Sequence, residues 1–442
     1  MKKIKALICC ASLFLLATAC NEEKKETKIT ESEIIESYVY LLGRALAVRQ
    51  EVTDLSEEGI DYNMIKYNEA GKADFVNPNL DVAYMEAWFA MDENSAILLT
   101  IPKVENRYYT VQLMDGWGEV ITNINERNFP DHPYGQFALC LENTTAKIPD
   151  GALKVVLPNK KIKMLARVEL QNTWDTAVDL QKQFKAEVIG APKIEPVINF
   201  PMFTNKDLPD LAVFKYSEEL LKTIDSKMVA NDSIQRISQN VADYVQQSEA
   251  NSVLVKKVIQ EKAIPQFIAY AINEAGKLEN NWLATIYAGE YYGNYWTRTA
   301  ANFVGIWANS PKEVVYFIAS KDNEDNTLGS GQSYVLRFEK DNLPINSVNA
   351  FWSIILVDFP NYRVVVNELE RYNFNNYSPL TYEEDGGLQI YISPTYNPEW
   401  PKSNWLPSPK EQDFNLTIRM YVPKQNVVKG DWFPLGVEKI EE

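Results

Sequence analysis

The stretch SNWLPSPKEQDFNLTIRMYVP, residues 403–423, contains the signal that decides the fold of the C-terminal part of the chain. Its second half, FNLTIRMYVP, is rich in β-branched and aromatic residues, which is typical of a β-strand. Pro407 biases Leu406 toward an extended backbone, so a helix cannot run through that point. The stretch therefore predicts a strand that the chain enters through a stiff segment.

Trp405 lies inside this stiff segment and has little conformational freedom. A fixed tryptophan can anchor the final strand by packing, or it can offer its ring to a ligand. We expect Trp405 to anchor the strand while Asn404 faces a binding site, and a ligand platform at Trp405 is the alternative.

Strand signals of the same kind occur in two parts of the chain. After residue 300 they are EVVYFIAS, QSYVLRF, AFWSIILVD, YRVVVN and LQIYIS, and between about 75 and 170 they are AILLTIP, RYYTVQLMD, EVITNI, QFALCLE, LKVVLP and KMLARVEL. Proline, glycine, asparagine and aspartate residues separate them. Several short strands at this spacing predict a sandwich or a barrel in each part.

Helical patterns precede and connect these two strand-rich parts. Thr30 and Glu33 form a capping-box signature, and apolar residues at helical spacing follow, so residues 30–50 predict a helix. A second helix is expected over 173–186, and several more are expected over about 206–276, after a proline-containing linker.

The first twenty residues have the parts of a bacterial lipoprotein signal. The basic segment MKKIK precedes the apolar segment ALICCASLFLLATA, and LLATAC resembles a lipobox in which Cys20 would be the lipidated residue. The apolar run is too short for the alternative, a transmembrane anchor. We therefore expect a signal peptide at 1–20, a flexible tether at 21–29, and a protein held in the bacterial cell envelope by lipid alone. Asn21 is not the aspartate associated with inner-membrane retention, which favours the outer membrane.

The composition argues against several classes of function. The formal net charge of the 442-residue chain is −16, and removal of the first twenty residues, which hold three lysines and no acid, would make it −19. Such a surface opposes binding to nucleic acids and to anionic lipid.

Cys140 is the one cysteine after Cys20, and His132 is the one histidine, so a disulfide, a cysteine zinc site and a multi-histidine metal site are excluded within a processed chain. Phosphate-loop and dinucleotide-binding motifs are missing, and neither a metal nor a cofactor is expected.

Aromatic residues stand beside asparagine, aspartate and arginine in several motifs. These are VNPNLDVAY (76–84), LMDGWGE (113–119), YYGNYWTR (291–298), NELERYNFNNYSP (367–379) and SNWLPSP (403–409). Aromatic faces together with planar hydrogen-bonding side chains suit sugars and other polar ring compounds. The alternative is that the rings pack the edges of the sandwiches while asparagine and aspartate shape turns.

Two longer sets of motifs carry a family resemblance. PNLDVAY, RYYTVQLMDGW and Arg167 ahead of the expected helix make residues from about 75 to 187 resemble the bacterial domain of unknown function DUF1254. GNYWTRTA, LPINSVNAFWSIILVD, SNWLPSP and GDWFP make residues from about 293 to 434 resemble its partner domain, DUF1214. The resemblance implies two jelly-roll-like β-sandwich units with helices between them, and it implies no particular activity. Val82 stands where the DUF1254 pattern usually has threonine, so any role of that hydroxyl is absent here.

The expected fold is therefore mainly β with helices, in which two jelly-roll-like β-sandwich units are joined by a helical connector. After the signal peptide and the tether come the N-terminal helix and the first sandwich at 30–190. The linker and the helical connector follow at 191–285, and the second sandwich occupies 286–442.

The first functional hypothesis is a cell-envelope lipoprotein that binds a polar small molecule or glycan. Aromatic rings would stack on the ligand, Asp81 and the amides would orient its hydroxyls, and the arginines would bind any carboxylate. The expected ligand-binding residues are Asn79, Asp81, Tyr84, Trp117, Tyr295, Arg298, Arg371, Tyr372, Asn404 and Trp405.

Two alternatives stay open on the sequence. A cofactor-free hydrolase, lyase or isomerase would use Asp81 and Asp115 as acid and base, Tyr84 as a proton donor and Arg167 to stabilise charge. An envelope assembly or interaction module would need no small ligand, and the acidic surface and the tether fit it equally well. The sequence leaves the ligand, the reaction if any, the oligomeric state and the membrane leaflet open.

Overall fold

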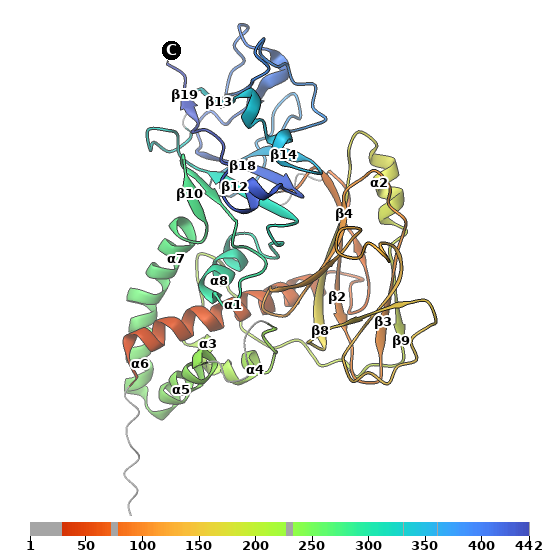
Figure 1. Cartoon of the computed structure of the whole chain (residues 1–442). Coiled ribbons are helices and arrows are strands. Elements are labelled where there is room, and N and C mark those ends of the chain that lie inside the picture. The colour runs from red at the N-terminus through yellow and green to blue at the C-terminus, as the bar shows by residue number, and fades with distance from the viewer. Residues whose placement is uncertain (1–28, 72–77, 227–232, 330, 360, 442) are drawn as a thin grey trace, which may run out of the picture.

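Figure 1 shows the computed structural model, which describes residues 29–71, 78–226, 233–329, 331–359 and 361–441. The first β-rich unit, coloured orange to yellow, lies at the right, and the second, coloured cyan to blue, lies at the top. Most helices gather at the lower left, α2 lies beside the first unit, and α1 runs from the other helices toward that unit.

The predicted signal peptide, its lipobox residue Cys20 and the predicted tether up to residue 28 lie outside the described residues. Within the described part of the chain, no helix is both long enough and apolar enough to cross a membrane.

The first β-rich unit is a sandwich of two sheets. One sheet has the strand order β1-β2-β8-β4-β5 and the other has the order β7-β6-β3-β9, with β6 and β7 parallel. Side chains from both sheets, including Phe89, Leu99 and Phe137, share one buried core, as the sequence predicts. The strands are β1 Lys66–Tyr67, β2 Val82–Ala90, β3 Ala96–Ile101, β4 Tyr109–Met114, β5 Val120–Ile124, β6 Gly135–Cys140, β7 Leu153–Val156, β8 Lys161–Glu169 and β9 Lys185–Ile189.

The second β-rich unit repeats this plan. A six-stranded sheet of order β10-β11-β12-β18-β14-β15 packs against a four-stranded sheet of order β17-β16-β13-β19, and Phe317, Leu336 and Ile354 lie in the shared core. Its first strands fall inside the range 191–285 that the sequence assigned to the connector. The strands are β10 Lys277–Glu279, β11 Trp282–Ala284, β12 Val314–Ala319, β13 Tyr334–Phe338, β14 Trp352–Asp358, β15 Asn373–Asn375, β16 Leu388–Ser393, β17 Trp405–Pro407, β18 Phe414–Tyr421 and β19 Glu438–Lys439.

Helix α1, Glu31–Leu55, is the centre of the helical group. Its predicted capping box is formed, because the side chains of Thr30 and Glu33 each accept a hydrogen bond from the other's backbone. Residues Tyr38–Val48 are buried on every side, so α1 packs within the helical core. The other elements are α2 Trp174–Gln181, α3 Ala212–Lys215, α4 Ser217–Leu221, α5 Ser233–Gln247, α6 Glu249–Val258, the π-helix Ile259–Ala263, α7 Ile264–Asn273, α8 Tyr295–Val304 and α9 Gln425–Val428, with 3₁₀ turns at Lys340–Asn342, Pro344–Ser347 and Lys402–Asn404.

The predicted helix over 173–186 is wrong at its C-terminal end. Helix α2 stops at Gln181, and Lys185–Ile189 form strand β9, antiparallel to β3. The edge of β3 offers backbone donors and acceptors, and pairing with them outweighs the local helical pattern.

The predicted strand YRVVVN, residues 362–367, does not form. Val364 makes an isolated bridge to Val357, and Val366 is 85% exposed. Strand β15 occupies the place beside β14 instead, so this valine-rich segment has no position in the sheet.

The two β-rich units meet through a small apolar cluster. Val82 and Tyr108 from the first unit pack with Val314, Phe351 and Tyr421 from the second. These residues stand at the ends of strands β2, β4, β12, β14 and β18. The contact therefore brings loop residues of both units to the same place.

Candidate functional site

A cleft of about 460 Å³ opens between the two β-rich units. Its walls are rich in carboxylate, amide and aromatic side chains. The first unit contributes Gly71, Leu80, Asp81, Glu169, Leu170, Gln171, Asn172 and Trp174, and the second contributes Phe351, Glu370, Tyr372, Asn373, Asn375, Tyr377, Ser378 and Pro379.

Asp81 reaches the cleft from the turn just before β2. Its backbone N–H donates to the side chain of Asn79 at 3.0 Å, which fixes the turn. Its Oδ1 accepts a hydrogen bond of 2.9 Å from each of the amides of Asn373 and Asn375. The two asparagines are two apart on β15, so their side chains leave the same face of the strand, while Phe374 between them lies in the core. The second unit thus presents a pair of amides to a carboxylate of the first.

The other oxygen of Asp81 is unusual. Oδ2 is buried and accepts no hydrogen bond from the described residues. Burial raises the pKa of Asp81, against the opposing effects of the nearby Ser353 hydroxyl, the two asparagine amides and the charge of Arg419. A carboxyl group in the wall of a cleft therefore has an acceptor that a ligand could satisfy.

Glu169, at the end of β8, differs from Asp81 in that both of its carboxylate oxygens accept hydrogen bonds. Oε1 accepts from the hydroxyl of Tyr377 at 2.7 Å, and Oε2 accepts from the backbone of Tyr108 at 3.0 Å and from the amide of Gln171 at 3.3 Å. Burial and the bond to Glu169 raise the pKa of Tyr377 to about 12. This hydroxyl stays protonated and links the two walls of the cleft.

Behind the cleft, an aromatic stack joins the two units. Phe351 stacks on Tyr421 with ring centroids 4.1 Å apart, and Tyr421 contacts Tyr108 at 5.3 Å. The amide of Asn79 donates to the hydroxyl of Tyr421 at 2.5 Å. The stack holds the cleft walls in place.

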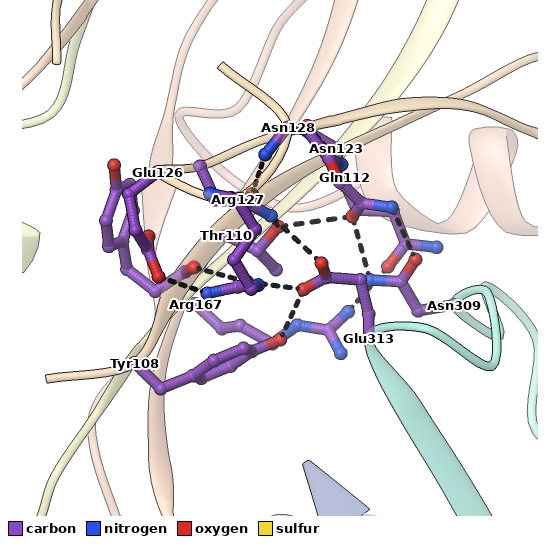
Figure 2. A network of polar contacts seen from close by, with 12 residues as sticks. Tyr108, Thr110, Gln112, Asn123, Glu126, Arg127, Asn128, Arg167, Asn309 and Glu313 are labelled. Carbon is purple, nitrogen blue, oxygen red and sulfur yellow. Dashed lines mark hydrogen bonds and ion pairs between the residues drawn. The ribbon is translucent and has the colours of Figure 1, made fainter. Parts of the chain in front are cut away.

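A buried polar network continues from Tyr108 across the same boundary (Figure 2). The carboxylate of Glu313, just before β12, accepts hydrogen bonds from the Tyr108 hydroxyl at 3.2 Å, from Arg127 at 2.8 Å and from Asn125 at 3.0 Å. Farther along, the side-chain amides of Asn123 and Asn309 donate to each other's oxygens at 2.9 Å. Such a network of hydrogen bonds between the two units fixes their orientation.

The structure brings some of the sequence-predicted residues to the cleft or next to it. Asp81 and Tyr372 line it. Asn79 lies directly behind it and also donates to the Tyr84 hydroxyl at 3.2 Å. Arg167 stacks over the ring of Tyr84 at 5.4 Å. Tyr84 and Arg167 are therefore connected to the cleft through Asn79 but are not among the residues that line it.

Three other predicted residues, Asp115, Trp117 and Arg298, lie together elsewhere. Arg298, on α8, pairs with Asp225 at 2.6 Å and lies 3.8 Å from a carboxylate oxygen of Glu119. Its guanidinium also stacks over Trp117, 5.0 Å from the ring centroid. We call Asp115, Glu119, Asp225 and Arg298 the sealed charge cluster, because each is at most 2% exposed.

Within the sealed charge cluster, Asp115 shapes its own loop. Its Oδ1 accepts from the backbone of Trp117 and of Glu119, and its Oδ2 accepts from the hydroxyl of Ser226 at 2.6 Å. Burial raises the pKa of Asp115, and it raises the pKa of Glu119 to about 7 although Arg298 opposes that shift. The cluster holds α8, the β4–β5 turn and the segment after α4 together.

Tyr295 lies in a third place. Its hydroxyl donates to Glu36 at 2.7 Å, and it lines a second cavity of about 380 Å³ beside the start of α1 and α5. This cavity belongs to the helical group.

The remaining predicted residues, Arg371, Asn404 and Trp405, form a cluster that attaches β17 to the second unit. Arg371 donates to the Trp405 carbonyl at 2.9 Å, and Asn404 makes three hydrogen bonds to the backbone of neighbouring segments. The indole of Trp405 donates to the Ser393 carbonyl at 3.1 Å. In this arrangement the tryptophan anchors its strand, and none of the three residues lines the cleft.

Sequence reasoning missed several cleft residues, among them Glu169, Trp174, Asn373, Asn375 and Tyr377. The motif NELERYNFNNYSP does contain three of them, and the alternation Asn-Phe-Asn signals two amides on one face of a strand. Glu169 and Trp174 carry no such local signal, because their place in the cleft depends on how the second unit packs on the first.

Comparisons with known proteins agree with this architecture. The family model of the protein of unknown function DUF1254 matches residues 62–188, and that of the protein of unknown function DUF1214 matches residues 313–425. The chain belongs to this two-domain family of unknown function. None of the curated proteins compared with it matches.

Two solved structures were compared with the fold of this chain. A crystal structure of a Vibrio parahaemolyticus protein superposes with a TM-score of 0.63 at 17% identity, covering 93% of this chain and 100% of that one. A putative uncharacterised protein from Burkholderia cenocepacia gives a TM-score of 0.42 at 12% identity, covering 93% and 92%. The first likeness supports the fold.

The cleft lies between the two family domains. All its residues from the first unit fall within the DUF1254 match, and all those from the second fall within the DUF1214 match. Asp225 and Arg298 of the sealed charge cluster lie outside both matches. Among the described residues, no group of three or more His, Cys, Asp or Glu side chains is arranged to hold a metal ion.

Proposed function

We propose that this DUF1254–DUF1214 protein binds a polar small molecule or glycan in the cleft between its two domains. The observation that carries the proposal is that both domains contribute hydrogen-bonding and aromatic side chains to one cavity. A volume of about 460 Å³ is within the range of small-molecule sites, roughly 300–1,000 Å³. The cavity is large enough for a ligand the size of a sugar ring with substituents.

The cleft offers two kinds of contact. Asp81, Asn373 and Asn375 provide amide and carboxylate groups that are already oriented by their mutual hydrogen bonds. Trp174 and Tyr372 provide aromatic surface that can cover the apolar face of a ring. Because the polar groups are held by β15 and by the turn before β2, little ordering is required when a ligand binds.

A cofactor-free enzyme is the second candidate, and the carboxyl of Asp81 is the observation in its favour. A raised pKa in a cleft is typical of an acid–base residue. Glu169 is the other buried carboxylate of the cleft, but both its oxygens already accept hydrogen bonds. Asp115, the other expected acid–base residue, lies in the sealed charge cluster. Binding is therefore the better-supported function.

The expected location follows from the lipobox. We propose that Cys20 carries lipid and that the protein is anchored in the bacterial cell envelope, with the outer membrane favoured. Cells expressing the full chain should incorporate labelled palmitate into it, and Cys20→Ser should abolish the label and release the protein from the membrane fraction. Equal labelling of both forms would refute the anchor.

Ligand binding is tested by a thermal-shift screen of saccharides and polar metabolites, because a ligand that binds the native state raises its melting temperature. Affinities of the hits are then measured by calorimetry for the wild type, for Tyr372→Ala and for Tyr382→Ala. Tyr372 lines the cleft, whereas Tyr382 is an exposed tyrosine of the same domain outside it. We expect Tyr372→Ala to weaken binding about tenfold through loss of ring contact and Tyr382→Ala to leave it unchanged. Equal affinity of all three proteins would place the ligand elsewhere.

A further inference from the structure

We infer that the ligand of the cleft is an organic ammonium, that is, a polar molecule with a positively charged nitrogen. This inference rests on the proposed function, which it narrows from polar molecules in general to cations. It starts from the charges on the walls of the cleft.

Three carboxylates line the cleft, namely Asp81, Glu169 and Glu370, and the described residues of its lining include no lysine, arginine or histidine. Asp81 and Glu169 are each 3% exposed, and their hydrogen-bond donors are neutral amide, hydroxyl and backbone groups. An anionic ligand would lose its hydration there and face only like charge. The described walls therefore favour cations over anions.

Arginines do occur in neighbouring segments, and each of them donates to at least one backbone carbonyl. Arg107 donates to the carbonyls of Glu169 and Leu170, and Arg371 donates to that of Trp405. Arg419 donates to the carbonyl of Pro78 at 3.0 Å. None of the three lines the cleft, although the charge of Arg419 acts on Asp81 and that of Arg107 acts on Glu169.

A neutral sugar and a cation differ in what they offer Asp81. Oδ1 already accepts from two amides, while Oδ2 is buried and accepts nothing from the described residues. An ammonium N–H supplies both a donor and a compensating charge to a carboxylate held in a buried site, whereas a hydroxyl supplies the donor alone. The orphaned oxygen thus favours the charged ligand.

Aromatic side chains supply the second feature that an ammonium uses. Phe351, Tyr372, Tyr377 and Trp174 all line the cleft. The face of an aromatic ring attracts an ammonium group, and the attraction grows when water is excluded. Carboxylates and rings in one cavity are the combination by which proteins bind amines and quaternary ammonium groups.

The inference is tested with ligands that share one body and differ in charge. Calorimetric titrations of the processed full chain would use glucosamine, N-acetylglucosamine, glucose and glucuronate, with choline and spermidine as cations of other shape. We expect at least one cation to bind ten or more times as tightly as every neutral probe, and glucuronate not to bind. If a neutral sugar binds as well as the cations or better, this inference fails while the proposed function stands. If no probe binds, both are rejected.

A matched pair of variants separates the cleft from the general acidity of the protein. Glu370 lines the cleft and is exposed, and Glu368 is exposed two residues away but does not line it. Glu370→Gln should weaken cation binding about three- to fivefold, the size expected for one accessible charge, and Glu368→Gln should leave it unchanged. Equal losses in the two variants would show diffuse attraction to an acidic surface and would overturn the inference.

Discussion

The cleft and the sealed charge cluster are both built around three carboxylates, yet they differ in what surrounds those groups. In the sealed charge cluster, Asp115, Glu119 and Asp225 share Arg298, and no member is more than 2% exposed. In the cleft, Asp81, Glu169 and Glu370 line open space, and no lysine or arginine is among the lining residues that the structure describes. The first arrangement contains a cation for its carboxylates, whereas the second presents its carboxylates to a cavity.

This difference separates structural from functional use of the same residue types. A buried carboxylate needs a nearby positive charge or several donors, and a protein that supplies these internally uses the group to hold segments together. A carboxylate whose oxygen lacks a donor beside a cavity keeps its interaction for another molecule. Substitutions in each of the two regions test this difference.

The largest effect is expected at Arg298. Arg298→Met would leave three buried carboxylates without their cation, so the free energy of unfolding should fall by about 3–5 kcal/mol. Denaturant unfolding followed by fluorescence measures it. Arg337→Met is the matched control, because Arg337 pairs with Glu438 at the exposed surface, and it should change stability by less than about 1 kcal/mol. Similar effects of the two variants would contradict the structural role of the cluster.

The next effect is a pH dependence caused by Glu119. Its pKa is raised from 4.5 to about 7 in the folded protein, so folding favours its protonated form. The associated stabilisation is complete below about pH 4.5 and is lost as the pH rises through 7, an overall change of about 3 kcal/mol.

Unfolding at pH 5 and at pH 8 in the wild type and in Glu119→Gln checks this dependence. The variant should lose less stability than the wild type between the two pH values, because its side chain does not titrate. The raised pKa of Asp115 acts in the same direction, so part of the slope should survive. Parallel pH profiles for the two proteins would show that Glu119 does not titrate as described.

In the cleft, we expect a substitution to change ligand affinity more than stability. Asp81→Asn removes a buried charge that pairs with no cation among the described residues of the lining, so stability at pH 7 should stay within about 1 kcal/mol of the wild type. Affinity for the cleft ligand should fall about tenfold, equivalent to about 1.4 kcal/mol. Calorimetry and denaturant unfolding of one preparation measure both. A large loss of stability with unchanged affinity would make the cleft another structural cluster.

The smallest effect is expected at Tyr377. Tyr377→Phe deletes the hydroxyl that donates to Glu169 across the cleft, which should cost about 1 kcal/mol of stability. Tyr382→Phe, at an exposed position of the same domain, should cost nothing measurable in the same unfolding experiment. If both variants unfold like the wild type, the hydrogen bond between Tyr377 and Glu169 contributes nothing to stability.

The sequence predicts the local features of this fold well. The capping box at Thr30 and most strands form where residue patterns place them, since these depend on neighbours along the chain. The errors arise where pairing between strands decides whether a segment joins a sheet. Lys185–Ile189 become a strand because the edge of β3 is available, and the valines of YRVVVN find no partner strand.

The site is less predictable for a related reason. The motifs around Asp81 and around Trp117 look alike in composition, since each sets an aromatic residue near an aspartate. One borders the cleft and the other is sealed, because packing between distant segments decides which side chains meet solvent. Trp174 and Glu169 enter the cleft by the same packing, which no local pattern encodes.

Helix α1 has a mechanical consequence for an anchored protein. The proposed lipid attachment at Cys20 precedes it by a short segment, so tension on the anchor would reach the fold at Glu31. The helix begins among the other helices and runs toward the first sandwich, buried along much of its length (Figure 1). A pull along its axis must shear many side-chain contacts at once rather than peel them away one turn at a time. Tension on the proposed anchor would thus be carried by contacts along the helix and not by its first turn alone.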